Sequence, residues 1–381
     1  QGHADDAEAS FSPGVRRKEG ILHDLMLRGS DSIAEGVSRV KVRIQDIAER
    51  VGVSSATVSN ALNGRGGVGE TKLKQILSLA REMGYVFERN SLNNKDYIRL
   101  VIFKRHGLVV MDTQFFAEIL EHMTREAKQN GYELLVTHIN MEKDQDYLKQ
   151  INEICMEDCA GIILLATEMF SEDLRLFAHT KAPLLVLDSM FRHDNYNCVV
   201  MNNYEAGYIA GERLIAMGHT SIEHITASVR FNNMRDRRKG FQAAMVAHDI
   251  ALPEDFLWQV TPTVEGAYRD MLDLLEKRKR PLPTAFFIAY DVMAVGCVRA
   301  LREKGISVPK DVSIIGMDDL NICQVTNPPL STIRVYREDI SRIAVQRLVA
   351  MMSPAAPKSV QKTEVSVTLV DRQSIRDLNT N

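Results

Sequence analysis

The sequence predicts a small all-α head followed by an α/β core with two doubly wound parallel sheets. Residues 44–63 space their apolar side chains as a helix does and are interrupted by a glycine. From residue 98 onward, short apolar runs alternate with amphipathic helical segments. Nine such runs are more than one sheet usually holds. We therefore expect two sheets, each covered by helices on both faces.

The composition is that of an ordinary globular protein. The chain has 381 residues, of which 45% are apolar and 25% are charged, so two or three domains are expected. No apolar run reaches the length of about eighteen residues that a membrane helix requires. Residues 1–40 lack the apolar stretch of a secretory signal and are expected to be a disordered extension.

The cysteines give no sign of a metal or disulfide framework. There are five, and their spacing matches neither a zinc pattern nor a paired set. We expect reduced, mostly buried thiols in a cytoplasmic protein that has no metal site, no cofactor and no membrane segment.

Residues 41–85 are expected to form the head. The first helix buries one face, because its apolar residues recur at intervals of three and four: Ile44, Ile47, Ala48 and Val51. Gly52 then allows a turn, since glycine adopts a positive φ without steric cost. Ser54 stands at the N-cap of the second helix, where its hydroxyl can accept a hydrogen bond from a backbone N–H.

The second helix, at about 55–62, is the candidate DNA-reading element. It buries Val58 with Ala61 and Leu62. Its remaining side chains are short, so they can approach bases and phosphates closely: Ser55, Ala56, Thr57, Ser59 and Asn60. A third helix follows and ends near Gly84. The glycine-rich segment 64–69 follows a helix rather than a strand, so we interpret it as a flexible turn rather than a phosphate-binding loop.

Charge supports this interpretation. Residues 41–95 carry nine Lys and Arg against five Asp and Glu, although the whole chain has a net charge of −3. A basic head on an acidic body is typical of a DNA-binding module joined to a domain of another kind. Residues 86–97 are polar and are expected to be a hinge or linker.

The core is expected to cover residues 98–381. Its predicted strands are 98–103, 132–139, 161–166, 183–189, 198–201, 221–227, 256–260, 285–289 and 312–317. Its predicted helices are about 115–130, 144–158, 204–217, 236–248, 264–278 and 291–304.

Ligands of such folds bind beyond the carboxyl ends of the strands. Carboxylates, arginines and aromatic rings follow several predicted strands, and the effector-site candidates are Asp112, Phe115, Phe116, Asp188, Arg235, Arg237, Tyr290, Asp291 and Asp318. Charged groups bind hydroxyls and rings cover the apolar face of a sugar, so the set favours a small polyol. Each carboxylate is equally compatible with a helix cap or a turn.

Residues 42–64, VRIQDIAERVGVSSATVSNALNG, resemble the head of the lactose/galactose-repressor family of bacterial transcription regulators. The resemblance extends over about 41–375, with further matching segments at 202–219, 237–245, 291–319 and 327–335. It implies a hinge and a core like the periplasmic sugar-binding proteins. The implied subdomains are 98–201 with 330–353, and 202–329 with 354–381, because the chain crosses between them three times.

The resemblance also implies roles for single residues. Ser55, Ala56 and Asn60 would read the major groove, and Thr57, Ser59 and Asn63 would contact phosphates. Asn60 replaces an arginine that is frequent in the family, which favours an adenine contact over a guanine contact. Leu92 is the only leucine in the hinge, and it lies two residues before the position from which the family's leucine enters the minor groove.

In the core, Phe115, Asp188, Arg235 and Asp318 match effector-contact positions of the family. Tyr290 replaces a polar residue, such as asparagine, that usually precedes Asp291. A bulkier contact, or one that stacks on the effector, is implied there.

The sequence thus predicts a homodimeric DNA-binding regulator, a repressor by family habit, which binds a pseudo-palindromic operator under control of a small metabolite such as a sugar. Two other functions are compatible with parts of the sequence. A transport receptor would share the core, but it would need a secretory signal and would lack residues 44–83. An enzyme would need a nucleophile, base or metal constellation, and the sequence shows no such motif.

Overall fold

The computed structural model describes residues 42–62, 69–83, 96–110, 114–353 and 355–380. The chain divides into two compact units, residues 1–90 and 91–381. Among the described residues, no helix has both the length and the apolar character needed to cross a bilayer.

The first unit contains three helices, α2 (Ile44–Val51), α3 (Ser55–Leu62) and α4 (Glu70–Glu82). Gly52 ends α2 with a φ of 70°, and the backbone N–H of Thr57 donates to Ser54 Oγ at 3.1 Å. The predicted turn and N-cap are thus both confirmed. The three helices pack around a small apolar core: Ile47, Ala48, Val51, Val58, Ala61, Ile76 and Ala80.

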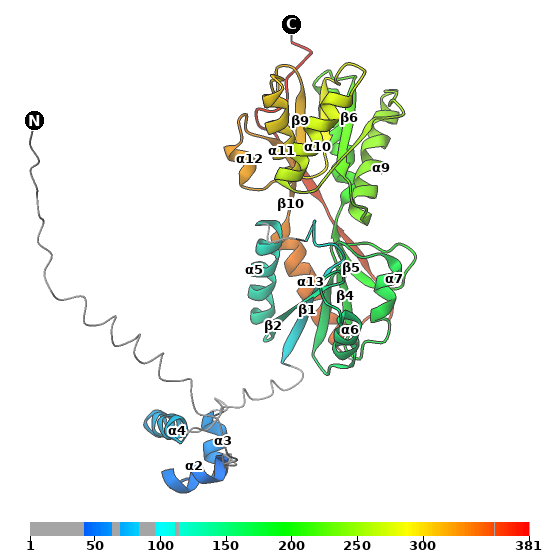
Figure 1. The fold of residues 1–381 in the computed structure, drawn as a ribbon. Helices are drawn as coiled ribbons and strands as arrows, with labels where there is room; N and C mark the ends of the chain where they lie inside the picture. Colours follow the sequence, from blue (N-terminus) through cyan, green and yellow to red (C-terminus); the bar gives the residue numbers. More distant parts are fainter. Residues whose placement is uncertain (1–41, 63–68, 84–95, 111–113, 354, 381) are drawn as a thin grey trace, which may run out of the picture. The chain divides into compact units, whose positions relative to one another are not determined.

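The second unit contains two six-stranded sheets (Figure 1). The first has the order β11-β5-β4-β3-β1-β2, and all its strands are parallel. Its strands are β1 (Tyr97–Lys104), β2 (Glu133–Asn140), β3 (Gly161–Leu165), β4 (Leu184–Leu187), β5 (Asn197–Met201) and β11 (Lys362–Val365). Its helices are α5 (Gln114–Gln129), α6 (Tyr147–Met156), α7 (Ser171–Leu174) and α13 (Arg337–Met352), with a short 3-10 turn at Arg175–Phe177.

The second sheet has the order β12-β10-β9-β8-β6-β7, and only β12 is antiparallel to its neighbour. Its strands are β6 (Ile222–Ala227), β7 (Leu257–Val260), β8 (Ala285–Ile288), β9 (Ser313–Asp318), β10 (Ser331–Val335) and β12 (Val367–Val370). Its helices are α8 (Asn203–Ala216), α9 (Asn232–Ala247), α10 (Val264–Lys277), α11 (Asp291–Glu303) and α12 (Ile322–Val325). The predicted fold class, a helical head with a two-sheet α/β core, is confirmed.

The chain crosses between the sheets three times, as predicted, but two crossings lie later than expected. The first follows β5, near residue 202. The second follows β10, which pairs with β9 and so belongs to the second sheet. The third separates β11, paired with β5, from β12, paired with β10. Assigning 330–353 to the first subdomain and 354–381 to the second was therefore wrong for these strands, because backbone pairing places β10 and β11 in the opposite sheets.

Helices α8 and α9 cross at unusually short range, and this contact sets the position of α9. A Cβ atom at Gly240 would lie 1.8 Å from the carbonyl oxygen of Tyr204, and one at Gly207 would lie 1.9 Å from that of Arg237. Only glycine allows the two backbones to approach this closely. The contact holds the first half of α9 against the crossing after β5, where the candidate site residues lie.

Candidate DNA-binding head and effector site

Helix α3 presents the side chains predicted to read DNA. Ser55 and Ala56 are exposed, whereas Thr57, Ser59 and Asn60 are half-buried. The hydroxyl of Thr57, a predicted phosphate contact, lies 2.8 Å from Ser54 Oγ, and Ser54 is the N-cap of the same helix. An exposed surface of short side chains at the start of the helix permits close approach to a DNA groove.

Two predicted DNA contacts cannot be placed. Asn63 and Leu92 lie outside the described residues, and so do most residues of the predicted hinge.

In the core, two predicted carboxylates follow strands of different sheets. Asp188 follows β4 and Asp318 ends β9, and the two residues are 5% and 2% exposed. Both have positive φ, 61° for Asp188 and 119° for Asp318. Residues other than glycine rarely adopt these values, and such strain is concentrated at binding sites.

The two carboxylates differ in their hydrogen bonds. Asp188 Oδ2 accepts from the hydroxyl of Thr167 at 2.6 Å, and its carbonyl oxygen accepts from the side-chain amide of Asn233 at 3.0 Å. The carbonyl oxygen of Asp318 accepts from Arg337 at 2.6 Å. No donor from the described residues lies within hydrogen-bonding distance of the Asp318 carboxylate. Asp318 therefore keeps an acceptor that a ligand can use.

Burial raises the pKa of both acids. The pKa of Asp188 rises to about 6 and that of Asp318 to about 8, and in each case the Arg237 guanidinium opposes the shift. Asp318 is further disfavoured as an anion by the nearby charge of Asp291. Near neutral pH these two groups can take up or release protons when a ligand changes their surroundings.

Arg237 and Tyr290 lie near these two acids, and the charge of Arg237 acts on the pKa of both. Arg237 is 1% exposed and donates to Asn203 Oδ1 at 2.9 Å and to the carbonyl oxygen of Ala289 at 2.5 Å. Its guanidinium carbon lies 5.1 Å from the centre of the Tyr290 ring. Asp188, Asp318, Arg237 and Tyr290, all predicted from the sequence, are thus linked by hydrogen bonds, ring contacts or charge.

Other predicted residues have different surroundings. Asp291 is fully buried, and its two oxygens accept from the hydroxyl of Thr332 at 2.8 Å and from the backbone of Leu320 at 3.2 Å. It joins α11 to β10 and to the loop after β9, which is a structural role; its predicted effector contact stays a prediction. Arg235 is exposed and pairs with the adjacent Asp236 at 3.3 Å. Asp112 lies outside the described residues.

The predicted aromatic pair lies at the start of α5. Phe115 is buried and packs edge-on against the half-buried Phe116, with 5.1 Å between ring centres. Arg337 lies over the Phe115 ring, and its Nε donates to Glu118 at 2.6 Å. The same guanidinium bonds Asp318, so Arg337 joins α5 of the first sheet to β9 of the second.

Glu168, just after β3, was not among the predicted residues. It is fully buried, and its two oxygens accept five backbone N–H groups from the loop after β1 at 2.8–3.0 Å: Arg105, His106, Gly107, Val109 and Val110. The polar pair Thr167–Glu168 directly after an apolar strand is the same signal that identified Asp188. Among the described residues, no group of three or more His, Cys, Asp or Glu side chains could hold a metal ion.

Two sequence families match parts of the chain. Bacterial regulatory proteins of the lacI family match residues 43–87, and the periplasmic binding protein-like domain matches residues 212–375. The HTH-type transcriptional repressor PurR of Erwinia tasmaniensis is 30% identical over 340 residues, covering 88% of this chain and 97% of the relative. PurR of Actinobacillus pleuropneumoniae is 30% identical over 346 residues, covering 88% and 99%.

Solved structures agree on the fold. The lac repressor dimer bound to operator and the anti-inducer ONPF superposes with a TM-score of 0.73 at 22% identity, over 88% of this chain and 99% of that one. The complex of the regulator CelR with cellobiose gives a TM-score of 0.66 at 20% identity, over 88% and 100%. The chain therefore belongs to the lacI family of bacterial regulatory proteins, as a DNA-binding transcriptional regulator with a helix-turn-helix head and a small-molecule-binding core.

Proposed function

We propose that this protein is a dimeric cytoplasmic repressor. Its affinity for the operator rises or falls when a small hydroxyl-rich metabolite, such as a sugar, binds between the two sheets of the core. No catalytic step is part of this function. The effector half is supported by the placement of Asp188 and Asp318, two buried acids with positive φ at the ends of strands in different sheets, near enough for the charge of Asp188 to raise the pKa of Asp318. A ligand that bonds both would favour one arrangement of the two sheets over another.

For the DNA half, we assign Ser55, Ala56 and Asn60 to base contacts and Thr57 and Ser59 to phosphate contacts. The exposure of Ser55 and Ala56 on an N-capped helix supports the assignment. One such helix reads only a few base pairs, so two copies on a two-fold axis would be needed for specificity.

The DNA half is tested by selecting binding sites from a random duplex pool and measuring affinity by fluorescence anisotropy at several salt concentrations. Asn60→Ala should weaken binding to the selected site by about tenfold, because one base contact contributes roughly 1–3 kcal/mol. Ser78→Ala, on the exposed side of α4, is the matched control and should bind as the parent does. An unenriched pool, or equal affinities for both variants, would refute the assignment.

The effector half is tested by thermal-shift screening of the full chain with monosaccharides and disaccharides, since a ligand that binds the native state raises its melting temperature. Asp318→Asn should abolish the shift. Asp371→Asn should retain it, because Asp371 pairs with Arg213 at the surface. A shift that survives Asp318→Asn would place the effector elsewhere.

A further inference from the structure

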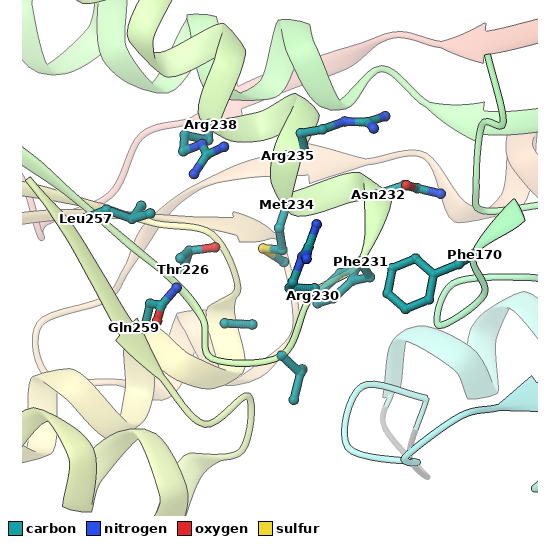
Figure 2. A pocket seen from close by; sticks show the side chains of 12 residues that line it. Phe170, Thr226, Arg230, Phe231, Asn232, Met234, Arg235, Arg238, Leu257 and Gln259 are labelled. Carbon is teal, nitrogen blue, oxygen red and sulfur yellow. The ribbon is translucent and has the colours of Figure 1, made fainter. Parts of the chain in front are cut away.

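A pocket of about 280 Å³ lies between the start of α9 and the neighbouring strands β6 and β7, of which β7 is at the edge of its sheet. Figure 2 shows its lining, which includes Thr226 of β6, Gln259 of β7 and Arg230 of the connecting loop. The volume is sufficient for a phosphate group on a small organic body. None of the side chains that line it is acidic, as far as the described residues extend.

Three arginines line this space. Arg230 comes from the loop before α9, and Arg235 and Arg238 come from α9 itself (Figure 2). Of the three, Arg235 pairs with the adjacent Asp236 at 3.3 Å. Within the described part of the chain, neither Arg230 nor Arg238 forms an ion pair, and Arg238 Nε is buried without a hydrogen-bond partner. A buried guanidinium N–H that lacks an acceptor is costly unless a ligand supplies one.

Arg230 is exposed and Arg238 is half-buried, whereas three more deeply buried arginines of the core have carboxylate partners. Arg278 pairs with Glu223 at 3.0 Å, and Arg337 pairs with Glu118 at 2.6 Å. Arg372 likewise pairs with Asp319 at 2.6 Å. These three guanidinium groups each have a carboxylate partner and Arg237 donates to neutral oxygens, whereas Arg230 and Arg238 have no such partner among the described residues.

The start of α9 adds a further preference for an anion. This helix of 16 residues begins at Asn232 with no side-chain cap and no acidic residue in its first turn. Its first backbone N–H groups therefore lack a negative partner at the end where the helix dipole is positive. Asn232 and Met234 of this turn line the pocket.

The pocket is separated from the carboxylate site by Phe231. This ring lines the pocket and also packs edge-on against Tyr290, with 6.3 Å between ring centres. Adjacent residues of α9 belong to the two sites. Arg237 lies in the carboxylate site and donates to the carbonyl oxygen of Ala289, and Arg238 lines the pocket. The first site carries two acidic side chains, whereas the second carries two arginines, Arg230 and Arg238, that form no ion pair within the described part of the chain.

We propose that this pocket binds the phosphate group of a small phosphorylated metabolite, as a second ligand site separate from the carboxylate site. Arg230 and Arg238 hold the phosphate oxygens, and the first turn of α9 adds backbone donors. Phe170, which comes from the first sheet's side and lies under the Arg105 guanidinium at 4.8 Å, closes the pocket. A ligand here therefore touches both halves of the core and influences how they close on each other.

The test is isothermal titration of the full chain with inorganic phosphate, glucose 6-phosphate and glucose. We expect saturable binding of inorganic phosphate, glucose 6-phosphate or both. Comparing their affinities tells whether the phosphate group alone binds or the sugar part of glucose 6-phosphate also contributes. Glucose should not compete for the site. Arg238→Gln and Arg230→Gln should each weaken binding about tenfold or more, because each removes charged hydrogen bonds.

Lys239→Gln is the matched control, since it removes the same charge from the same helix at an exposed residue that does not line the pocket; it should retain the parent affinity. Arg238→Lys should recover part of the lost affinity if the charge matters and the fold is intact. Asp318→Asn should leave phosphate binding unchanged, which separates this site from the proposed effector site. Absence of saturable binding by both inorganic phosphate and glucose 6-phosphate, or equal loss in Lys239→Gln and Arg238→Gln, would overturn the proposal.

Discussion

The head and the core place their candidate recognition residues in opposite ways. In the head, the candidates follow one another along a single helix, α3, and the cap at Ser54 fixes where that helix begins. In the core, Asp188 and Asp318 are far apart in the chain and come together only because parallel strands end at one edge of each sheet. Local sequence pattern therefore suffices for the first site, whereas topology makes the second.

The head and the core should also respond independently to mutation. The two regions are distinct compact units with separate apolar cores. A change in one unit should leave the stability of the other unaltered, and three substitutions test this in order of decreasing effect.

The largest effect is expected from Gly240→Ala in the core. The added Cβ would lie 1.8 Å from the carbonyl oxygen of Tyr204, so α8 and α9 must separate. We expect the core to lose about 3 kcal/mol or more of its free energy of unfolding. Urea denaturation followed by the fluorescence of Trp258, the single tryptophan, measures it. Gly69→Ala in the head, where a Cβ meets no atom within 4 Å, is the control; equal stability of the two variants would contradict the packing argument.

The second effect is a change in the pH dependence of core stability. The folded pKa of Asp318, about 8, lies above its ordinary value of 3.8, so the native state keeps a proton that the unfolded chain releases. The contribution of Asp318 to stability is therefore greatest below pH 4 and declines as pH rises toward 8, by at most about 1.4 kcal/mol per pH unit. Asp318→Asn keeps that site neutral and should flatten the decline between pH 6 and 8.

Asp371→Asn, a change at the surface, should preserve the slope of the parent protein. If the parent and Asp318→Asn show the same slope in melting temperature against pH, Asp318 does not carry a raised pKa.

The smallest of the three effects concerns the head. Ser54→Ala removes the oxygen that accepts the backbone N–H of Thr57, and N-cap losses of this kind cost about 1 kcal/mol. Hydrogen exchange of the full chain should show faster exchange across α3 and unchanged exchange in the core. Ser78→Ala should exchange like the parent; uniform acceleration in both units would contradict their independence.

Much of the fold follows from the sequence because most strands are continuous apolar runs. The nine predicted strands and six predicted helices all correspond to elements of the structure. Three strands near the C-terminus were not predicted. One of these, β11, is an edge strand whose residues alternate between exposed and half-buried, so it lacks the apolar run of the central strands. The same omission displaced the predicted subdomain boundaries.

Only part of the candidate effector site could be predicted, because the sequence does not say which side chains are buried or bonded to distant segments. Arg235 and Arg237 are two residues apart on α9 and therefore lie on different faces, but the sequence does not say which face is inward. The structure buries Arg237 and exposes Arg235. Asp291 has the residue type and strand-end position of a ligand contact, yet Thr332 and Leu320 occupy its oxygens. Partners from distant segments cannot be read from local spacing.

The most direct test of the central claim is an anisotropy titration of the selected operator with the full chain, with and without the sugar that gives the largest thermal shift. We predict that the sugar changes operator affinity by about fivefold or more, a coupling of at least roughly 1 kcal/mol. We also predict that Asp318→Asn binds the operator as the parent does but no longer responds to the sugar. Operator affinity that is identical with and without every sugar of the panel would contradict the claim that the core controls the head.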